Sequence, residues 1–168
     1  MKRTNIARIA PAVAACALAA ALLGGCATQA ANPEATRGEE NRQYMAQVNQ
    51  IMDDLGAQLE SFEDAVSADD LAGMQIEANE AFRTIDELAA IEPTEDMKAV
   101  HESYTQGCAD LENALSLYLG LYTEIANATE EHPFDYSEYD TRLAEIQEAY
   151  DNGIEQLKTG DETVASMQ

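Results

Sequence analysis

A heptad-spaced apolar pattern between residues 97 and 125 constrains the fold more than any other feature of this sequence. Apolar and small side chains recur there every seven residues in two columns, one starting at Met97 and the other at Val100. Because two turns of an α-helix take about seven residues, each column lies on one side of a helix. The stretch therefore predicts a long helix with a buried face. Gly107 and Ala114 stand in the second column, where small side chains let a neighbouring helix approach closely.

Three further segments carry apolar side chains at intervals of three and four, with charged residues between them. This spacing is typical of amphipathic helices. The segments cover residues 41–66, 69–91 and 137–158. Four helices with short connections favour antiparallel neighbours. The sequence therefore predicts an all-α fold, an antiparallel up-down four-helix bundle.

Residues that favour helix ends stand between these segments. Ser67 is expected to cap the second helix and Thr94 the central one, because their side-chain oxygens accept hydrogen bonds from the first free backbone N–H groups. Asp135 or Ser137 is expected to cap the last helix in the same way. Pro93 ends the second helix, since the residue before a proline is pushed out of helical geometry.

The first 25 residues differ from the rest of the chain. Lys2, Arg3 and Arg8 precede an apolar run over residues 9–23, and small residues close that run. This order is typical of a cleaved secretory signal peptide. The run is also shorter than the roughly 20 residues that a membrane-spanning helix needs. We therefore expect the mature chain to lie outside the cytoplasm.

The order Leu23-Gly24-Gly25-Cys26 at the end of this signal resembles the lipobox of bacterial lipoproteins. The resemblance implies that Cys26 becomes the new N-terminus and carries a diacylglycerol on its sulfur, whose two acyl chains are enough for firm anchoring. The expected location is extracytoplasmic, lipid-anchored to the bacterial cell membrane. The alternative is an ordinary signal peptide cleaved a few residues further on, with Cys26 unmodified.

These patterns divide the chain into four parts. Residues 1–25 form the signal peptide, and residues 26–40 form a lipidated flexible tether without an apolar period. Residues 41–160 form the helical bundle domain, and residues 161–168 a polar C-terminal tail that is expected to fray. A single cysteine remains free after processing, so no intrachain disulfide is expected.

The mature chain is strongly acidic. The sequence holds nine Lys and Arg and 32 Asp and Glu; three of the basic residues lie in the signal, and all the acidic ones follow it. The chain from Cys26 onward therefore carries a formal charge of −26. Binding to nucleic acid is not expected, since phosphates require clustered Lys and Arg. Direct docking on anionic lipid is not expected for the same reason.

Motifs that mark enzymes are missing from the sequence. It lacks HExxH for a zinc hydrolase, CxxCH for covalent haem and a glycine-rich phosphate loop. Carboxylate-bridged di-metal bundles need a glutamate three residues before a histidine. Here Lys98 precedes His101 at that spacing, and Thr129 precedes His132. We therefore expect no enzymatic activity, no cofactor and no dedicated metal site.

One face of the central helix carries the candidate binding residues. His101, Tyr104 and Cys108 stand at intervals of three and four, so they share that face. An imidazole, a phenol and a thiol would line a small pocket, with Tyr118 and Tyr122 as further lining residues. The alternative is ordinary core packing, in which a free cysteine behaves as a small hydrophobic residue.

The connection before the last helix combines acidic and aromatic side chains. The carboxylates are Glu130, Glu131, Asp135, Glu138 and Asp140, and the rings between them are Phe134, Tyr136 and Tyr139. The regular aspartate spacing of a calcium loop is missing, so only a weak, non-specific attraction of cations is expected. Arg142 follows at helical spacing from Glu138 and Glu145, and it is expected to pair with them.

The sequence favours an interaction or structural module of the bacterial cell envelope, with another envelope protein as its partner. The expected signature is an exposed apolar patch around Leu117, Leu119 and Leu121, where the central helix is apolar nearly all round. The alternative is a small-ligand-binding lipoprotein with a pocket between helices. An enzyme would require converging titratable groups with displaced pKa values.

Overall fold

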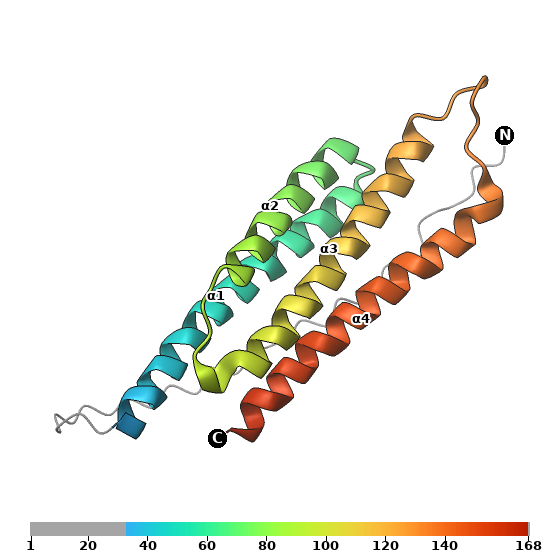
Figure 1. The fold of residues 1–168 in the computed structure, drawn as a ribbon. Coiled ribbons are helices and arrows are strands. Elements are labelled where there is room, and N and C mark those ends of the chain that lie inside the picture. Colours follow the sequence, from blue (N-terminus) through green and yellow to red (C-terminus); the bar gives the residue numbers. More distant parts are fainter. Residues whose placement is uncertain (1–32, 168) are drawn as a thin grey trace.

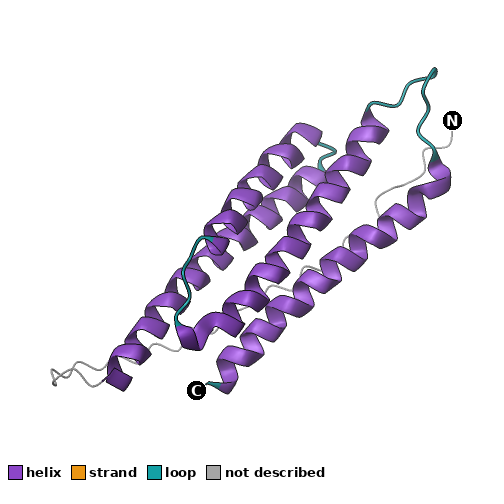
Figure 2. Cartoon of the chain, in the orientation of Figure 1, coloured by secondary structure: helices purple, strands orange, loops and turns teal. Residues whose placement is uncertain are grey.

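The structure, a computed structural model, describes residues 33–167. In this range the chain forms four helices that alternate in direction (Figure 1). They are α1 (Pro33–Ser67), α2 (Leu71–Ala89), α3 (Lys98–Ala126) and α4 (Tyr139–Ser166), with short 3-10 turns η1 (Glu95–Met97) and η2 (Tyr136–Glu138) before α3 and α4. Loops connect them (Figure 2). The predicted all-α up-down bundle is confirmed. The predicted signal peptide and Cys26 lie outside the described residues.

α1 begins well before the predicted helix. The sequence predicts a flexible tether up to residue 40, but the helix already starts at Pro33. Proline suits the first helical position, where its missing N–H has no partner to lose, and Glu34 lies near the positive end of the helix. The side chains of residues 34–40 are mostly exposed. This extension therefore has no apolar period by which it could be recognised.

α4 extends beyond its predicted end. The sequence predicts fraying from residue 161, but the helix continues to Ser166. Gly160 is buried against Tyr104, because a Cβ atom at Gly160 would lie 3.2 Å from the tyrosine ring. Asp161 accepts a hydrogen bond from the Tyr104 hydroxyl at 2.5 Å, and Val164 packs against the core. These contacts hold the last turns of α4, so the predicted fraying is wrong for residues 161–166.

Asp70, rather than the predicted Ser67, caps α2. Its carboxylate accepts a hydrogen bond from the backbone N–H of Gly73 at 3.0 Å. Asp69 has a left-handed φ of 55°, a conformation that Asp tolerates better than most residues. α1 runs through Ser67 itself, so the reversal falls on Asp69 and the cap on the residue after it.

The other two predicted caps differ in outcome. Thr94 makes no side-chain cap at η1. Its hydroxyl donates instead to Asn41 Oδ1 on α1 at 2.5 Å, so it joins two elements. Asp135 accepts a hydrogen bond from the Ser137 N–H at 2.9 Å, which confirms the predicted cap before the last helix.

The core lies between α1, α2 and α3, where large side chains interdigitate. The largest that are less than 2% exposed are Leu55, Met74, Leu88, Leu111, Leu121, Val48, Val100 and Cys108. Leu121 is thus buried, and Leu117 and Leu119 are half-buried. The predicted exposed patch around these three leucines is therefore wrong, because α3 has helices on both sides: α2 and α4.

α4 packs closely on α3 at two facing glycines, where Leu157 lies against Gly107 and Leu111 lies against Gly153. A Cβ atom at Gly107 would lie 2.9 Å from the carbonyl oxygen of Gly153, and one at Gly153 would lie equally close to the oxygen of Gly107. The close approach predicted at Gly107 is confirmed. Within the described residues, no Cα atom of α4 comes within 8 Å of α1 or α2. Close contact with α3 alone therefore positions α4.

The up-down order gives the bundle two different ends. The base holds the start of α1, the α2–α3 connection and the end of α4 (Figure 1). The tip holds the α1–α2 turn and the α3–α4 connection, residues 127–138. α3 spans 29 residues, so about 43 Å separates the two ends at 1.5 Å per residue.

Candidate interaction site

The five candidate binding residues of α3 fall into two groups. His101, Tyr104 and Cys108 lie in the half of α3 toward the base, and Tyr118 and Tyr122 lie in the half toward the tip. Neither of the two hollows described below includes any of them. Each group instead contacts side chains of neighbouring helices at its own level of the bundle.

His101 contacts Tyr44 of α1. The Tyr44 hydroxyl lies 3.0 Å from His101 Nδ1, and the two rings meet edge to face with centroids 6.1 Å apart. Burial lowers the pKa of His101 and raises the pKa of Tyr44 to about 12. A neutral imidazole accepts a hydrogen bond from a phenol. The pair is therefore an uncharged link between α1 and α3 at neutral pH.

Tyr104 and Cys108 are both buried. Tyr104 donates its hydroxyl hydrogen bond to Asp161 of α4, and burial, followed by this bond, raises the pKa of the phenol. The sulfur of Cys108 lies 4.0 Å from that of Met52 on α1. Burial raises the pKa of this thiol to about 12, so it stays protonated and unreactive. At this level of the bundle, side chains fill the space between the helices.

Tyr118 and Tyr122 belong to an aromatic column that leads toward the tip. Their rings stack with centroids 4.9 Å apart, and Phe62 of α1 meets Tyr118 edge-on at 5.7 Å. Burial raises the pKa of Tyr118. The column leads toward Tyr139, whose pKa is raised first by burial and then by the phenol of Tyr122.

Beyond this column lies a cluster that we call the aromatic tip, consisting of Phe134, Tyr136 and Tyr139. The ring of Phe134 meets Tyr136 edge-on at 4.9 Å and Tyr139 at 6.4 Å, and the two tyrosine rings are 6.1 Å apart. Tyr136 is 66% exposed. Exposed tyrosine rings that neighbouring rings hold in place are typical of protein interfaces.

A hollow of about 410 Å³ adjoins the aromatic tip. Phe134 and the carboxylates of Asp135 and Glu138 are among its walls, together with Arg142. Arg142 donates two hydrogen bonds to the carboxylate of Glu124 on α3, at 2.5 and 3.0 Å. These bonds lower the pKa of Glu124.

The hydrogen-bonded partner of Arg142 is therefore not the one predicted. The sequence predicts pairing with Glu138 and Glu145, which are helical neighbours of Arg142. Glu124 lies on α3 instead, and it presents both oxygens to the guanidinium. Such a two-bond geometry is stronger than a single contact along one helix.

Carboxylates dominate the surface around the aromatic tip, since the charge of Arg142 is balanced by Glu124. The exposed acidic residues there are Glu130, Glu131, Asp135, Glu138 and Asp140. Hydrogen bonds from Ser137, first from its backbone N–H, lower the pKa of Asp135. The aromatic tip therefore lies in a negative field at neutral pH.

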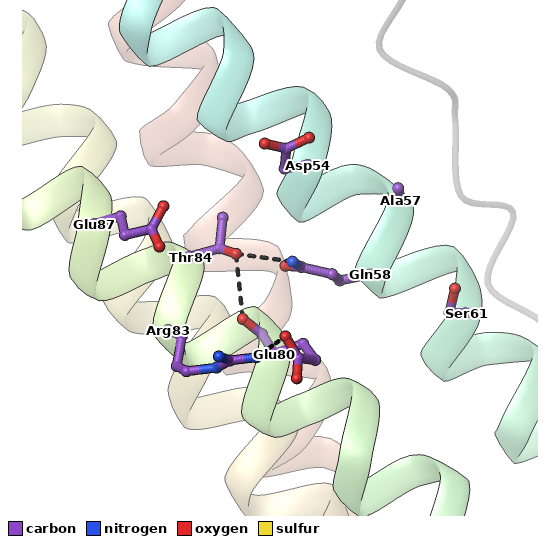
Figure 3. Close-up of a pocket in the computed structure, with 8 residues that line it drawn as sticks. All are labelled: Asp54, Ala57, Gln58, Ser61, Glu80, Arg83, Thr84 and Glu87. Carbon is purple, nitrogen blue, oxygen red and sulfur yellow. Dashed lines mark hydrogen bonds and ion pairs between the residues drawn. The ribbon is translucent and has the colours of Figure 1, made fainter.

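A second hollow, of about 400 Å³, lies between α1 and α2 (Figure 3). Its lining is polar, and Arg83 pairs there with Glu80. Gln58 donates to the Thr84 hydroxyl at 2.8 Å, but its own Oε1 is buried without a hydrogen-bond partner. This buried acceptor was not predictable from the sequence, because a glutamine on the polar side of a predicted helix is expected to be solvated.

In residues 33–167, no three His, Cys, Asp or Glu side chains gather into a group suited to a metal ion. None of the helices in this range carries an apolar stretch long enough to cross a bilayer.

Comparisons of the chain with protein-family models, with curated proteins and with solved structures find no match. A proposal for its function therefore depends on the residues and geometry described above, of which the aromatic tip is the most distinctive.

Proposed function

We propose that this chain is a lipid-anchored lipoprotein whose acidic helical bundle acts as an interaction module of the bacterial cell envelope. The observation that carries the proposal is the aromatic tip, an exposed ring cluster at the end of the bundle opposite the start of α1 (Figure 1). Tyrosine is enriched among the residues that dominate binding energy in protein interfaces. The tip is therefore the surface that meets the partner.

The position of the lipid anchor supports this orientation. Pro33 lies seven positions after Cys26, and seven residue steps reach at most about 25 Å. A diacylglycerol on Cys26 keeps the base near the membrane, while the length of α3 carries the tip about 43 Å further. The acidic surface also disfavours lying flat on anionic lipid. The tip thus faces away from the membrane.

A cysteine substitution tests the anchor. Cys26→Ser removes the sulfur that would carry the lipid, so the protein is expected in the soluble or unprocessed fraction, without the mass of a diacylglycerol. Cys16→Ser in the same leader is the matched control and is expected to leave fractionation and mass unchanged. Membrane fractionation and mass that stay the same in Cys26→Ser contradict the anchor.

Photocrosslinking tests the interaction surface. A photoreactive residue in place of Tyr136 is expected to give adducts with an envelope component in intact cells. The control position is Ile76 on α2, which is similarly exposed at 59% but lies outside the aromatic tip. Absence of adducts at Tyr136, or the same adducts at Ile76, contradicts the interaction module.

A second candidate function is the binding of a small ligand, and the α1–α2 hollow supports it. The unpartnered Oε1 of Gln58 lines a polar hollow of about 400 Å³, and a buried acceptor without a partner costs about 1–3 kcal/mol. A small amine or amide that donates to this oxygen would raise the Tm of the protein. The same compound should leave the Tm of Gln58→Met unchanged.

A further inference from the structure

We propose that the aromatic tip binds an arginine-rich segment of a partner protein. This assignment rests on the proposed function and adds the chemistry of the partner. It follows from the rings of Phe134 and Tyr136, from the carboxylates beside them, and from the hollow that separates the rings from Arg142.

The charge of the surface selects a cationic partner. Five exposed carboxylates surround the aromatic tip, and the guanidinium of Arg142 is already engaged by both oxygens of Glu124. A positive segment approaching the tip is therefore attracted, whereas an acidic segment or an anionic lipid surface is repelled. A second copy of this chain, docked tip to tip, would bring two such negative surfaces together.

The aromatic rings favour arginine over lysine as the source of that charge. A guanidinium is planar, stacks on aromatic faces and donates two parallel hydrogen bonds to one carboxylate, whereas an ammonium is a compact and strongly hydrated point charge. The tip offers both kinds of group together: the exposed ring of Tyr136, and the carboxylates of Asp135 and Glu138 in the wall of the hollow beside Phe134. A hollow of about 410 Å³ is large enough for an arginine side chain.

The test compares two peptides of equal charge on the full-length protein. Nona-arginine and nona-lysine are titrated at about 150 mM salt, where long-range attraction between exposed charges is largely screened. Nona-arginine is expected to bind at least threefold more tightly. Tyr136→Ser should weaken nona-arginine binding by about threefold to tenfold, the range of a partly desolvated cation–aromatic contact.

Matched variants separate the tip from the general acidity of the chain. Glu138→Gln should weaken nona-arginine binding more than Glu155→Gln, which removes the same charge at an exposed site on α4, away from the tip. Ile76→Ser should leave binding unchanged. Equal binding of the two peptides, or equal losses from Glu138→Gln and Glu155→Gln, shows attraction by overall charge and overturns the inference.

The crosslinked product distinguishes this inference from the proposed function. An adduct at position 136 that maps to an arginine-rich segment supports both. An adduct with a second copy of this chain, or with an acidic or apolar segment, overturns the arginine-rich partner but leaves an interaction module. No adduct at that position overturns both.

Discussion

The base and the tip of the bundle use their polar and aromatic side chains differently. At the base, hydrogen bonds join different helices: Tyr44 with His101, and Tyr104 with Asp161. At the tip, the rings pack on one another, and the phenol of Tyr136 remains in solvent. The base therefore fixes the helix ends, while the tip exposes aromatic area that the fold does not bury. Surface of that kind is available for binding.

Among changes at the two ends of the bundle, the largest effect on stability is expected from filling the glycine contact at the base. Gly160→Leu places side-chain atoms where the ring of Tyr104 already lies, 3.2 Å from the new Cβ, and overpacking of this kind costs about 1–3 kcal/mol. Urea unfolding measures the change. Gly56→Leu is the control: nothing lies within 4 Å of its Cβ position, so it should not destabilise the protein. Equal effects of the two changes would show that Gly160 does not fix the end of α4.

Removal of a single hydroxyl at the base should have the next largest effect. Tyr104→Phe deletes the hydrogen bond to Asp161, which joins α3 to α4. A net loss of about 1 kcal/mol in the free energy of unfolding is expected, because Asp161 is only half-buried and regains water. The last turns of α4 should also exchange their amide hydrogens faster. A variant with unchanged stability and exchange rates contradicts the role given to this bond.

Acidification should weaken the base through His101. Burial lowers the pKa of this imidazole in the folded chain below 6.5, so the unfolded chain takes up the proton first as the pH falls. The contribution of His101 to stability is therefore complete above pH 6.5, and it is lost as the pH falls through the lowered pKa. Unfolding by urea at a series of pH values measures it. His101→Asn should flatten the slope just below pH 6.5; an identical slope in the variant contradicts this assignment.

The smallest effect on stability is expected at the tip. Tyr136→Ser removes an exposed ring and should change the free energy of unfolding by no more than about 0.5 kcal/mol, as is usual for surface positions. The same variant should bind nona-arginine about threefold to tenfold more weakly. If it destabilises the protein as much as Tyr104→Phe does, the rings of the tip serve the fold, and the difference between the two ends disappears.

The four amphipathic helices were predictable, because burial of one helix face requires apolar residues at intervals of three and four. Gly107 was also recognisable, since a small residue stood where the heptad calls for a large one. The start of α1 was not, because residues 34–40 are mostly exposed and an exposed helix needs no apolar period. The end of α4 was missed because Gly160 looks like a helix breaker until its contact with Tyr104 is known.

The candidate site was less predictable than the fold. Phe134, Tyr136 and Tyr139 stand out in the sequence among carboxylates, but their spacing does not tell which ring is most exposed. That depends on how η2 and the loop before it connect α3 to α4, which involves contacts between rings rather than a helical period. The spacing of His101, Tyr104 and Cys108 did predict that these residues share one face of α3. It did not reveal that Tyr44, Asp161 and Met52 occupy the space opposite.

Energy transfer between the protein and a lipid surface tests most directly that the base is anchored and the tip is presented. Donor dyes are attached to Gln43→Cys at the base or to Tyr136→Cys at the tip, in lipidated protein reconstituted into vesicles with acceptor-labelled lipids. Cys108 is buried and its thiol stays protonated, so it does not compete for the dye. We expect strong transfer from position 43 and much weaker transfer from position 136, consistent with about 43 Å of additional distance along α3. Equal transfer from the two positions would mean that the bundle lies along the membrane, and it would contradict the account.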